Sequence, residues 1–227
     1  MKHRVWVEIN LKALVANYRK IAAHVKPAKV LCVLKANAYG LGVADYARAL
    51  AAAGCTNFGV AEPYEARELL DVLPKGRGID VQILSSVLPD EIPAMVRAGV
   101  VLPVIDCATA QLISDAAVRA KTVAKVHFKL DTGMGRLGIL ATGPDGVANV
   151  LATMRAVKAL PGLACEGIFS HFPMAYDPKD PFTKKQIALF KRIVAAAAQE
   201  GLSFKKVHIA ASDGINNFPE CARKPFT

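Results

Sequence analysis

The chain has 227 residues, enough for one large α/β domain, and 53% of them are hydrophobic. Charged residues contribute 21%, a balance that is typical of soluble globular enzymes and argues against intrinsic disorder. The net charge of +10 raises the hypothesis of a nucleic-acid partner, but the basic residues are spread along the chain without interleaved aromatics, which favours a solvated basic surface.

Neither a membrane span nor a secretion signal is expected. No apolar run approaches the roughly 18–20 residues that cross a bilayer, and charges occur throughout the first eight residues. The histidines show no metal-binding spacing, so no metal is expected. Five scattered cysteines form no C-x-x-C pair, which predicts buried free thiols in a reducing cytoplasm. They are Cys32, Cys55, Cys107, Cys165 and Cys221.

Residues 5–9 alternate like a strand with one polar face, and they lead into an amphipathic helical pattern over residues 11–25. From residue 30 onward, short β-rich runs alternate with helical periodicity, which indicates a parallel sheet built from βα units. The runs that are typical of buried strands cover residues 30–34, 57–60, 81–84, 100–105, 124–130, 164–170 and 207–210. The helical stretches between them cover residues 43–53, 63–72, 90–98, 109–119, 146–159 and 183–199.

Seven strands of the βα type predict an incomplete (β/α)8 barrel of the TIM type, because an eighth strand is due where the sequence stops at Thr227. A doubly wound open sheet is the alternative, but it would require a glycine-rich phosphate fingerprint after the first strand, and the sequence has none there. No linker divides the chain. We therefore expect residues 1–10 to form an N-terminal strand and residues 11–227 to form the incomplete barrel.

Catalytic residues of such a barrel are expected at the carboxyl ends of the strands. Lys35 ends the first apolar strand, and burial there would lower the pKa of its ammonium group, which suits a lysine that forms a Schiff base. A lysine that merely caps the strand is the alternative. Gly40 and Gly42 are expected to let the backbone turn closely past another group before the next helix.

The fifth strand ends in KLDTGMGRLG, where three charged residues surround a turn rich in glycine. Alternation places Lys129 and Asp131 on one face of the strand, and neither charge can be buried without a partner. One interpretation is a structural salt-bridge cluster. The other is that Arg136 is held in place to contact an anionic or electron-rich atom of a ligand.

Two further strand ends carry polar residues. His171 ends the sixth strand, where a histidine is as often a buried structural residue as a catalytic one. Ser212 follows the seventh strand just before a helix, a position that suits phosphate binding in these barrels.

Together these strand ends resemble the alanine racemase family, from RVWVEINLKALVANYR near the N-terminus to VHIAASDGINNFPE near the C-terminus. The most specific elements are KANAYG and KLDTGMGRLG, which occur in order on strands one and five. The resemblance implies pyridoxal 5'-phosphate as cofactor and the interconversion of L-alanine and D-alanine for peptidoglycan precursors, by two-base transfer of the α-proton. It also implies a cytoplasmic homodimer, with neither nucleic acid nor a membrane as partner.

The resemblance assigns a role to each matching position. Lys35 would carry the cofactor covalently and act as one of two acid/base catalysts, while Tyr39 and Ser212 would hold the cofactor phosphate. Arg136 would hydrogen-bond the phenolic oxygen of the cofactor and help to hold the substrate carboxylate. Lys129, which is often carbamylated in the family, would position Arg136.

The sequence departs from the family pattern in several places. Leu41 stands where a histidine is common, and Ala211 stands where an asparagine usually precedes the serine. The family's eighth strand supplies an arginine that faces the pyridine nitrogen beside the residue matching His171, which supports the ring end of the cofactor. Arg223 comes too early to be that arginine. The family's C-terminal β-domain, which supplies a catalytic tyrosine to the partner subunit, has no counterpart in these residues.

These departures predict an N-terminal fragment with little or no racemase activity by itself. A missing central strand would leave two open sheet edges, and residues 1–10 would pack on the absent C-terminal domain. Two alternatives stay open: a barrel that carries vitamin B6 without enzymatic activity, and a racemase for serine.

Overall fold

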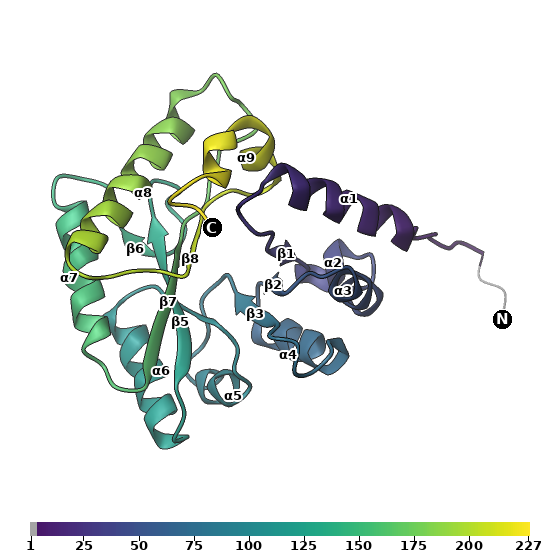
Figure 1. Ribbon diagram of the computed structural model, residues 1–227. Helices are drawn as coiled ribbons and strands as arrows, with labels where there is room; N and C mark the ends of the chain where they lie inside the picture. Colours follow the sequence, from purple (N-terminus) through teal and green to yellow (C-terminus); the bar gives the residue numbers. More distant parts are fainter. Residues whose placement is uncertain (1–3) are drawn as a thin grey trace.

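Parallel strands and helices alternate along the chain in the computed structural model, which describes residues 4–227 (Figure 1). The strands are β1 (Cys32–Val33), β2 (Asn57–Val60), β3 (Asp80–Ile83), β4 (Leu102–Val104), β5 (Ala124–Asp131), β6 (Ile139–Leu140), β7 (Leu163–Phe169) and β8 (Lys206–His208). The helices are α1 (Leu11–His24), α2 (Lys35–Tyr39), α3 (Val43–Ala52), α4 (Pro63–Val72), α5 (Ile92–Arg97), α6 (Cys107–Arg119), α7 (Gly146–Lys158), α8 (Pro181–Gln199) and α9 (Ser212–Asn217), followed by the short 3-10 helix η1 (Pro219–Ala222).

The strands form an incomplete barrel. β1, β2 and β3 pair in order, and β4, β5, β7 and β8 pair in order, all in parallel. An isolated parallel bridge between Gln82 and Val101 connects the two groups. The short strand β6 pairs with the end of β5 outside this path. The predicted α/β fold class, an incomplete barrel of the TIM type, is confirmed.

The ring of strands is open between β8 and β1. Within residues 4–227, no strand pairs with the free edge of either. β1 therefore forms a ladder with β2 alone and is only two residues long, shorter than predicted. Beside β8, the backbone N–H of Thr227 donates to the carbonyl oxygen of Val207 at 3.0 Å, and the N–H of Val207 donates to the Thr227 hydroxyl at 3.0 Å.

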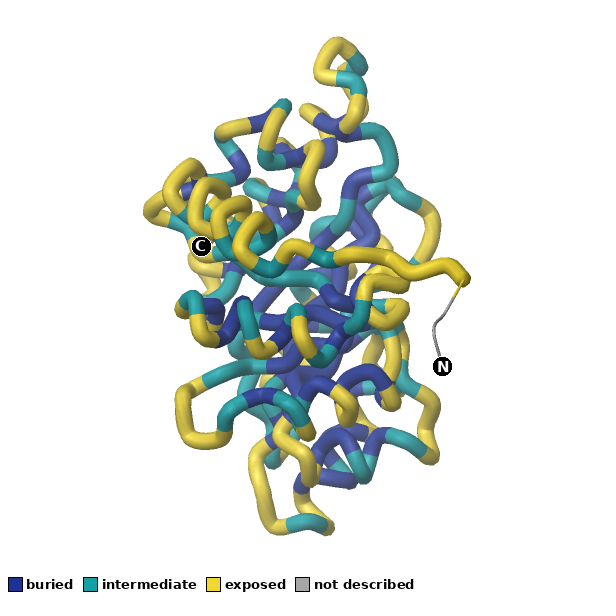
Figure 2. The backbone as a smooth tube through the Cα atoms, turned by 90° about the vertical axis from the view of Figure 1, so that its right-hand side faces the viewer, coloured by how far each residue is buried: buried dark blue, intermediate teal, exposed yellow. Residues whose placement is uncertain are grey.

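Most of the helices pack with apolar faces on the strands, and the buried residues form one continuous core (Figure 2). At the start of two helices, an aspartate side chain accepts a backbone N–H group of the first turn. Asp106 accepts the N–H of Thr109 at 2.6 Å at the start of α6, and Asp180 accepts the N–H of Phe182 at 2.6 Å at the start of α8. No helix in the described part of the chain is long and apolar enough to cross a membrane.

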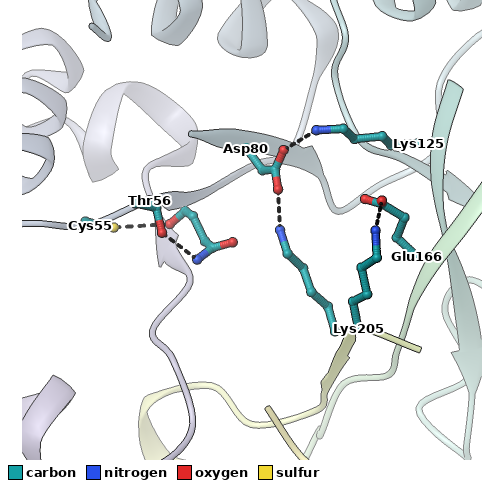
Figure 3. Close-up of polar contacts among 8 residues, drawn as sticks. Cys55, Thr56, Asp80, Lys125, Glu166 and Lys205 are labelled. Atoms are coloured by element: carbon teal, nitrogen blue, oxygen red, sulfur yellow. Dashed lines mark hydrogen bonds and ion pairs between the residues drawn. The ribbon is translucent and has the colours of Figure 1, made fainter. Parts of the chain in front are cut away.

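Charged side chains link the strands at the amino-terminal end of the barrel. The Asp80 carboxylate on β3 contacts Lys125 Nζ on β5 and Lys206 Nζ on β8, each at 2.6 Å (Figure 3). Burial alone would raise the pKa of Asp80, but hydrogen bonds from the two lysines outweigh it and lower that pKa. This ion cluster joins three strands at the end opposite the candidate site residues, so we interpret it as structural.

Two sequence-based predictions are wrong. Residues 5–9 form no strand, and the side chains of Val5, Trp6 and Val7 are 83%, 69% and 75% exposed. Their backbone has no strand to pair with in the described structure, which explains the difference. The proposed packing of residues 1–10 stays a prediction, and residues 1–3 lie outside the described residues. Cys107, expected to be buried, is exposed at the start of α6.

Candidate active site

A cavity of about 890 Å³ reaches from the carboxyl ends of the strands along β1 and β8 to helix α1. Six residues singled out from the sequence line it, and they come from the ends of β1, β5, β7 and β8. They are Lys35, Tyr39, Lys129, Arg136, His171 and Ser212. Leu41 and Ala211, which depart from the family pattern, line it as well. The structure thus brings every predicted site residue to one place.

The charge of the lining is one-sided. Lys29, Lys35, Lys129 and Arg136 line the cavity, whereas none of its described lining residues is an aspartate or a glutamate. Apolar side chains such as Leu84 and Ile209 complete the wall. Lys35, Lys129 and Arg136 lie around His171, and a mostly apolar cavity with three such cations suits a flat organic ligand that carries negative charge.

Lys35 is followed by a left-handed turn, α2. Four consecutive residues that are not glycine, Ala36 to Tyr39, have φ between 52° and 57°. This conformation places each Cβ close to a carbonyl oxygen and costs about 1–2 kcal/mol per residue. Within the turn, the N–H of Ala38 donates to the carbonyl of Leu34 at 3.0 Å, and the Asn37 side chain accepts the N–H of Val43 at 2.8 Å.

The glycines after this turn have a backbone conformation that favours glycine. Gly40 and Gly42 have φ of 84° and 95°, and a Cβ built on either would have no described protein atom within 4 Å. Their positive φ explains why glycine occurs there, and a close approach of this backbone to another group stays a prediction.

The turn after β5 is built around glycine and a local carboxylate. Asp131 accepts the N–H of Gly133 at 2.9 Å and the N–H of Gly135 at 3.1 Å. At Gly138, with φ of 125°, a Cβ would lie 2.7 Å from the carbonyl oxygen of Lys129. The carboxylate therefore fixes the turn, and no ion pair links Asp131 to Lys129 or Arg136 among the described residues. The structural salt-bridge interpretation is wrong.

Lys129 is a buried cation that forms no ion pair with a carboxylate among residues 4–227. It is 4% exposed, and its Nζ lies 4.4 Å from the centre of the Phe169 ring. Burial, reinforced by the positive charge of Arg136 and opposed by Asp131, lowers the pKa of Lys129 to about 8. A large fraction of the Lys129 amine is consequently neutral in mildly alkaline solution.

His171 lies where these cations converge. Burial, followed by the charges of Lys129, Arg136 and Lys35, lowers the pKa of His171 to about 4. Its imidazole is consequently neutral near pH 7, so it can accept or donate a hydrogen bond without adding a further positive charge.

Sequence analysis missed a buried polar network behind the site. Gln186 on α8 is 1% exposed, and its Nε2 donates to the Thr132 hydroxyl at 3.2 Å and to the His171 carbonyl at 3.3 Å. Ser170 lies 2.8 Å from the Thr132 hydroxyl and donates to the carbonyl of Leu130 at 2.9 Å. The network ties the ends of β5 and β7 together.

Glu65 was also missed. It is a buried carboxylate on α4 that accepts the backbone N–H of Ala36, the residue after Lys35. The available signal was a glutamate beside Ala66 and Leu69 on the apolar face of a predicted helix, next to an N-terminal proline.

Comparisons with known proteins agree with this fold. A family model described as "Alanine racemase, N-terminal domain" matches residues 9–225. Alanine racemase of Desulforamulus reducens is 36% identical over 221 residues, which are 97% of this chain and 58% of that protein. The solved alanine racemase of a D-cycloserine-producing Streptomyces lavendulae is 30% identical with a TM-score of 0.84, over 98% of this chain and 56% of that one.

A second solved structure contains a cofactor. Alanine racemase from Bartonella henselae, determined with covalently bound pyridoxal phosphate, is 30% identical with a TM-score of 0.78. The match covers 91% of this chain and 56% of that one. The chain spans slightly more than half the length of the curated relatives that it matches.

Proposed function

Because this chain belongs to the alanine racemase N-terminal domain family, we propose that it binds pyridoxal phosphate covalently through Lys35 and provides the cofactor-binding part of an alanine racemase. One observation carries the proposal. Residues from four separate strand ends line a single cavity, with the three cations Lys35, Lys129 and Arg136 at these ends and no acidic side chain among the described lining residues.

The cavity fits the charge and shape of this cofactor. Pyridoxal phosphate combines an aromatic ring with a dianionic phosphate, and the cavity offers apolar walls together with cations. The hydroxyls of Tyr39 and Ser212 are proposed to donate to the phosphate, as the resemblance implies. The neutral imidazole of His171 is proposed to support the ring end.

The proposed chemistry uses two residues of this chain directly. When bound, the cofactor withdraws electrons from Cα of an amino acid and so acidifies its proton. The Lys35 amine is proposed to accept or return that proton on one face of the substrate. Arg136 is proposed to hold the substrate carboxylate, since a guanidinium forms two parallel hydrogen bonds to a carboxylate.

The second proton-transfer group must lie on the opposite face of Cα. We assign it, as the resemblance implies, to a tyrosine of a partner subunit, and we expect little racemisation by this chain alone. The proposal includes the finer expectations of a homodimer in the cytoplasm that supplies D-alanine for peptidoglycan.

Lys129 is proposed to position Arg136 after reacting with carbon dioxide. As cations, the two side chains repel each other, and the charge of Arg136 helps to lower the pKa of Lys129 to about 8. The neutral amine can add to carbon dioxide and release a proton, which leaves a carbamate with a negative charge. That change would convert the repulsion into an ion pair. A carbamate signal from 13C-labelled carbon dioxide, absent from Lys129→Met, would support this role.

Absorption spectroscopy tests the proposed function. Pyridoxal phosphate added to the chain should give a visible band of the lysine-bound cofactor, and Lys35→Ala should lose it. Lys29→Ala is the matched control, because Lys29 also lines the cavity but belongs to no strand end. A wild-type chain without the band, or an equal band from Lys35→Ala, would contradict the proposal.

A second candidate function is a carrier of vitamin B6 without enzymatic activity. Binding alone would use the same cavity, since the residues that line it come from the strand ends of this chain. Exchange of the α-proton of alanine in deuterated water separates the two candidates. A carrier gives the visible band without exchange, whereas the racemase domain exchanges the proton slowly on the face of Lys35.

A further inference from the structure

Glu65 is a buried carboxylate that accepts three backbone N–H groups. It lies in the first turn of α4 and is 5% exposed. Its Oε2 accepts the N–H of Ala61 at 2.7 Å and that of Glu62 at 3.1 Å, and its Oε1 accepts the N–H of Ala36 at 2.5 Å. Bonds of this kind, from N–H groups to an ionised carboxylate, are among the stronger hydrogen bonds in proteins.

Helix capping accounts for only part of this arrangement. The bond from Glu62 closes a capping box at the start of α4, a common local motif. The bond from Ala36 comes from a residue 29 positions earlier in the chain, on a different strand end. This bond does not cap α4, so its structural effect must lie at Ala36.

Ala36 begins the strained left-handed turn. Its φ is 52°, and the next three residues keep the same conformation although none is glycine. Such a run persists only where the surrounding structure fixes it. Ala36 is itself exposed, yet its N–H reaches a buried carboxylate, which anchors the first peptide group of the turn.

The anchored peptide group directly follows Lys35. On the other side of Lys35, the N–H of Leu34 donates to the carbonyl of Gly59 at 2.8 Å. Both flanking segments are therefore held by β2 and by the start of α4. With the backbone fixed on both sides, the Cα–Cβ bond of Lys35 has one direction, which limits the part of the cavity that its amine can reach.

We propose that Glu65 is a positioning residue for Lys35, acting through the hydrogen bond to Ala36 that stabilises the left-handed turn. What Lys35 carries rests on the proposed function. The stabilisation of the turn by Glu65 is independent of the proposed function, because it follows from contacts within the chain alone.

Glu65→Gln tests the proposal with an isosteric change. The amide has one acceptor oxygen instead of two, and its NH2 group would face backbone donors, so the bond to Ala36 weakens. Asp106→Asn is the matched control, since Asp106 caps α6 in the same chemical manner but does not line the cavity. Both variants should show a lowered melting temperature.

Two readouts separate positioning from a general loss of stability. Hydrogen exchange of the Ala36 amide, followed by NMR without cofactor, should accelerate roughly tenfold to a hundredfold in Glu65→Gln. The affinity for pyridoxal phosphate, measured from its visible band, should fall by about tenfold. Asp106→Asn should change neither. In the wild-type chain, the Ala36 amide should already exchange much more slowly than an unbonded amide on the surface.

The outcomes are distinguishable from failure of the proposed function. A wild-type chain with no visible band contradicts the proposed function, and the exchange of Ala36 then decides the role of Glu65 alone. An Ala36 amide that exchanges as fast as an unbonded one in wild type overturns the proposal, even if Glu65→Gln fails to fold. So does a Glu65→Gln variant whose exchange and cofactor affinity match those of Asp106→Asn.

Discussion

Two turns lie beside the cations of the candidate site, one after β1 and one after β5, and they are built in opposite ways. After β5, the three residues with positive φ are glycines, and the fixing carboxylate of Asp131 lies within the turn itself. After β1, four consecutive residues that are not glycine adopt positive φ: two alanines, an asparagine and a tyrosine. The carboxylate that fixes this turn, that of Glu65, comes from another helix.

The difference concerns what each turn depends on. Glycine adopts positive φ without a steric penalty, so the turn after β5 is encoded almost entirely by its own residues. The turn after β1 is strained by itself and depends on contacts that form only when β2 and α4 are in place. The turn after Lys35 is thus the one that depends more on the rest of the fold, and substitutions can test the contrast.

The largest effect is expected at Gly138. Its Cβ in Gly138→Ala would lie 2.7 Å from the backbone of Lys129 at a φ of 125°, so the variant should lose about 3 kcal/mol of unfolding free energy or more. Gly40→Ala, with open space around its Cβ, should lose only about 1 kcal/mol. Urea denaturation of both variants measures the two losses, and equal losses would break the comparison.

Lys129 should give a pH-dependent effect. The folded chain releases this proton at a pKa of about 8, whereas an unshifted lysine releases it near 10.5, so the contribution of Lys129 to stability rises between those values. Below pH 8 the buried charge destabilises the fold. In buffer free of carbon dioxide, Lys129→Met should therefore be more stable than wild type at pH 7 by about 2 kcal/mol.

That advantage should shrink as the pH rises from 8 to 10. Denaturant midpoints of the two proteins, measured in parallel at each pH, cancel the titration of the other residues. A difference that stays constant with pH would contradict the lowered pKa of Lys129.

A smaller loss is expected for Asp131→Asn. The amide keeps one acceptor for the turn but gives up its charge, which should lower the unfolding free energy by about 1–2 kcal/mol. Asp45→Asn, which removes an exposed ion pair with Arg48, should have little effect. Calorimetric melting of both variants checks this prediction, and an unchanged Asp131→Asn would mean that the glycines alone fix the turn.

The smallest effect should have the opposite sign. Ala36→Gly removes the steric penalty of a positive φ but adds freedom to the unfolded chain, for a net gain of about 0.5 kcal/mol. Ala16→Gly, at an exposed position of the right-handed helix α1, should instead lose about 1 kcal/mol. If both substitutions destabilise equally, the turn after β1 is not strained.

The same contrast explains what the sequence could predict. The limits of β2 and α4 were predicted to the residue, because a short run typical of a buried strand and an N-terminal proline are local signals. The strand over residues 5–9 was wrong, because an alternating pattern reports a face to be covered and not whether a neighbouring strand is there. The resemblance to alanine racemase is confirmed by the family match.

The sequence predicted correctly those site residues that lie directly at the carboxyl end of a strand. Lys35 and His171 were placed by that rule, and the structure brings both to the cavity. The carboxylates could not be assigned in this way. Pairing of Asp131 with a charge was one of two interpretations, and Asp131 fixes a turn instead. The contact from Glu65 to Ala36 spans 29 residues, a separation that no local pattern reports.

Covalent trapping tests the central claim most directly. The chain is loaded with pyridoxal phosphate, reduced with borohydride to make the bond to the lysine permanent, digested, and mapped by mass spectrometry. Our account predicts one dominant modified peptide with the label on Lys35. A label mainly on Lys29, on Lys129 or spread over surface lysines would contradict it.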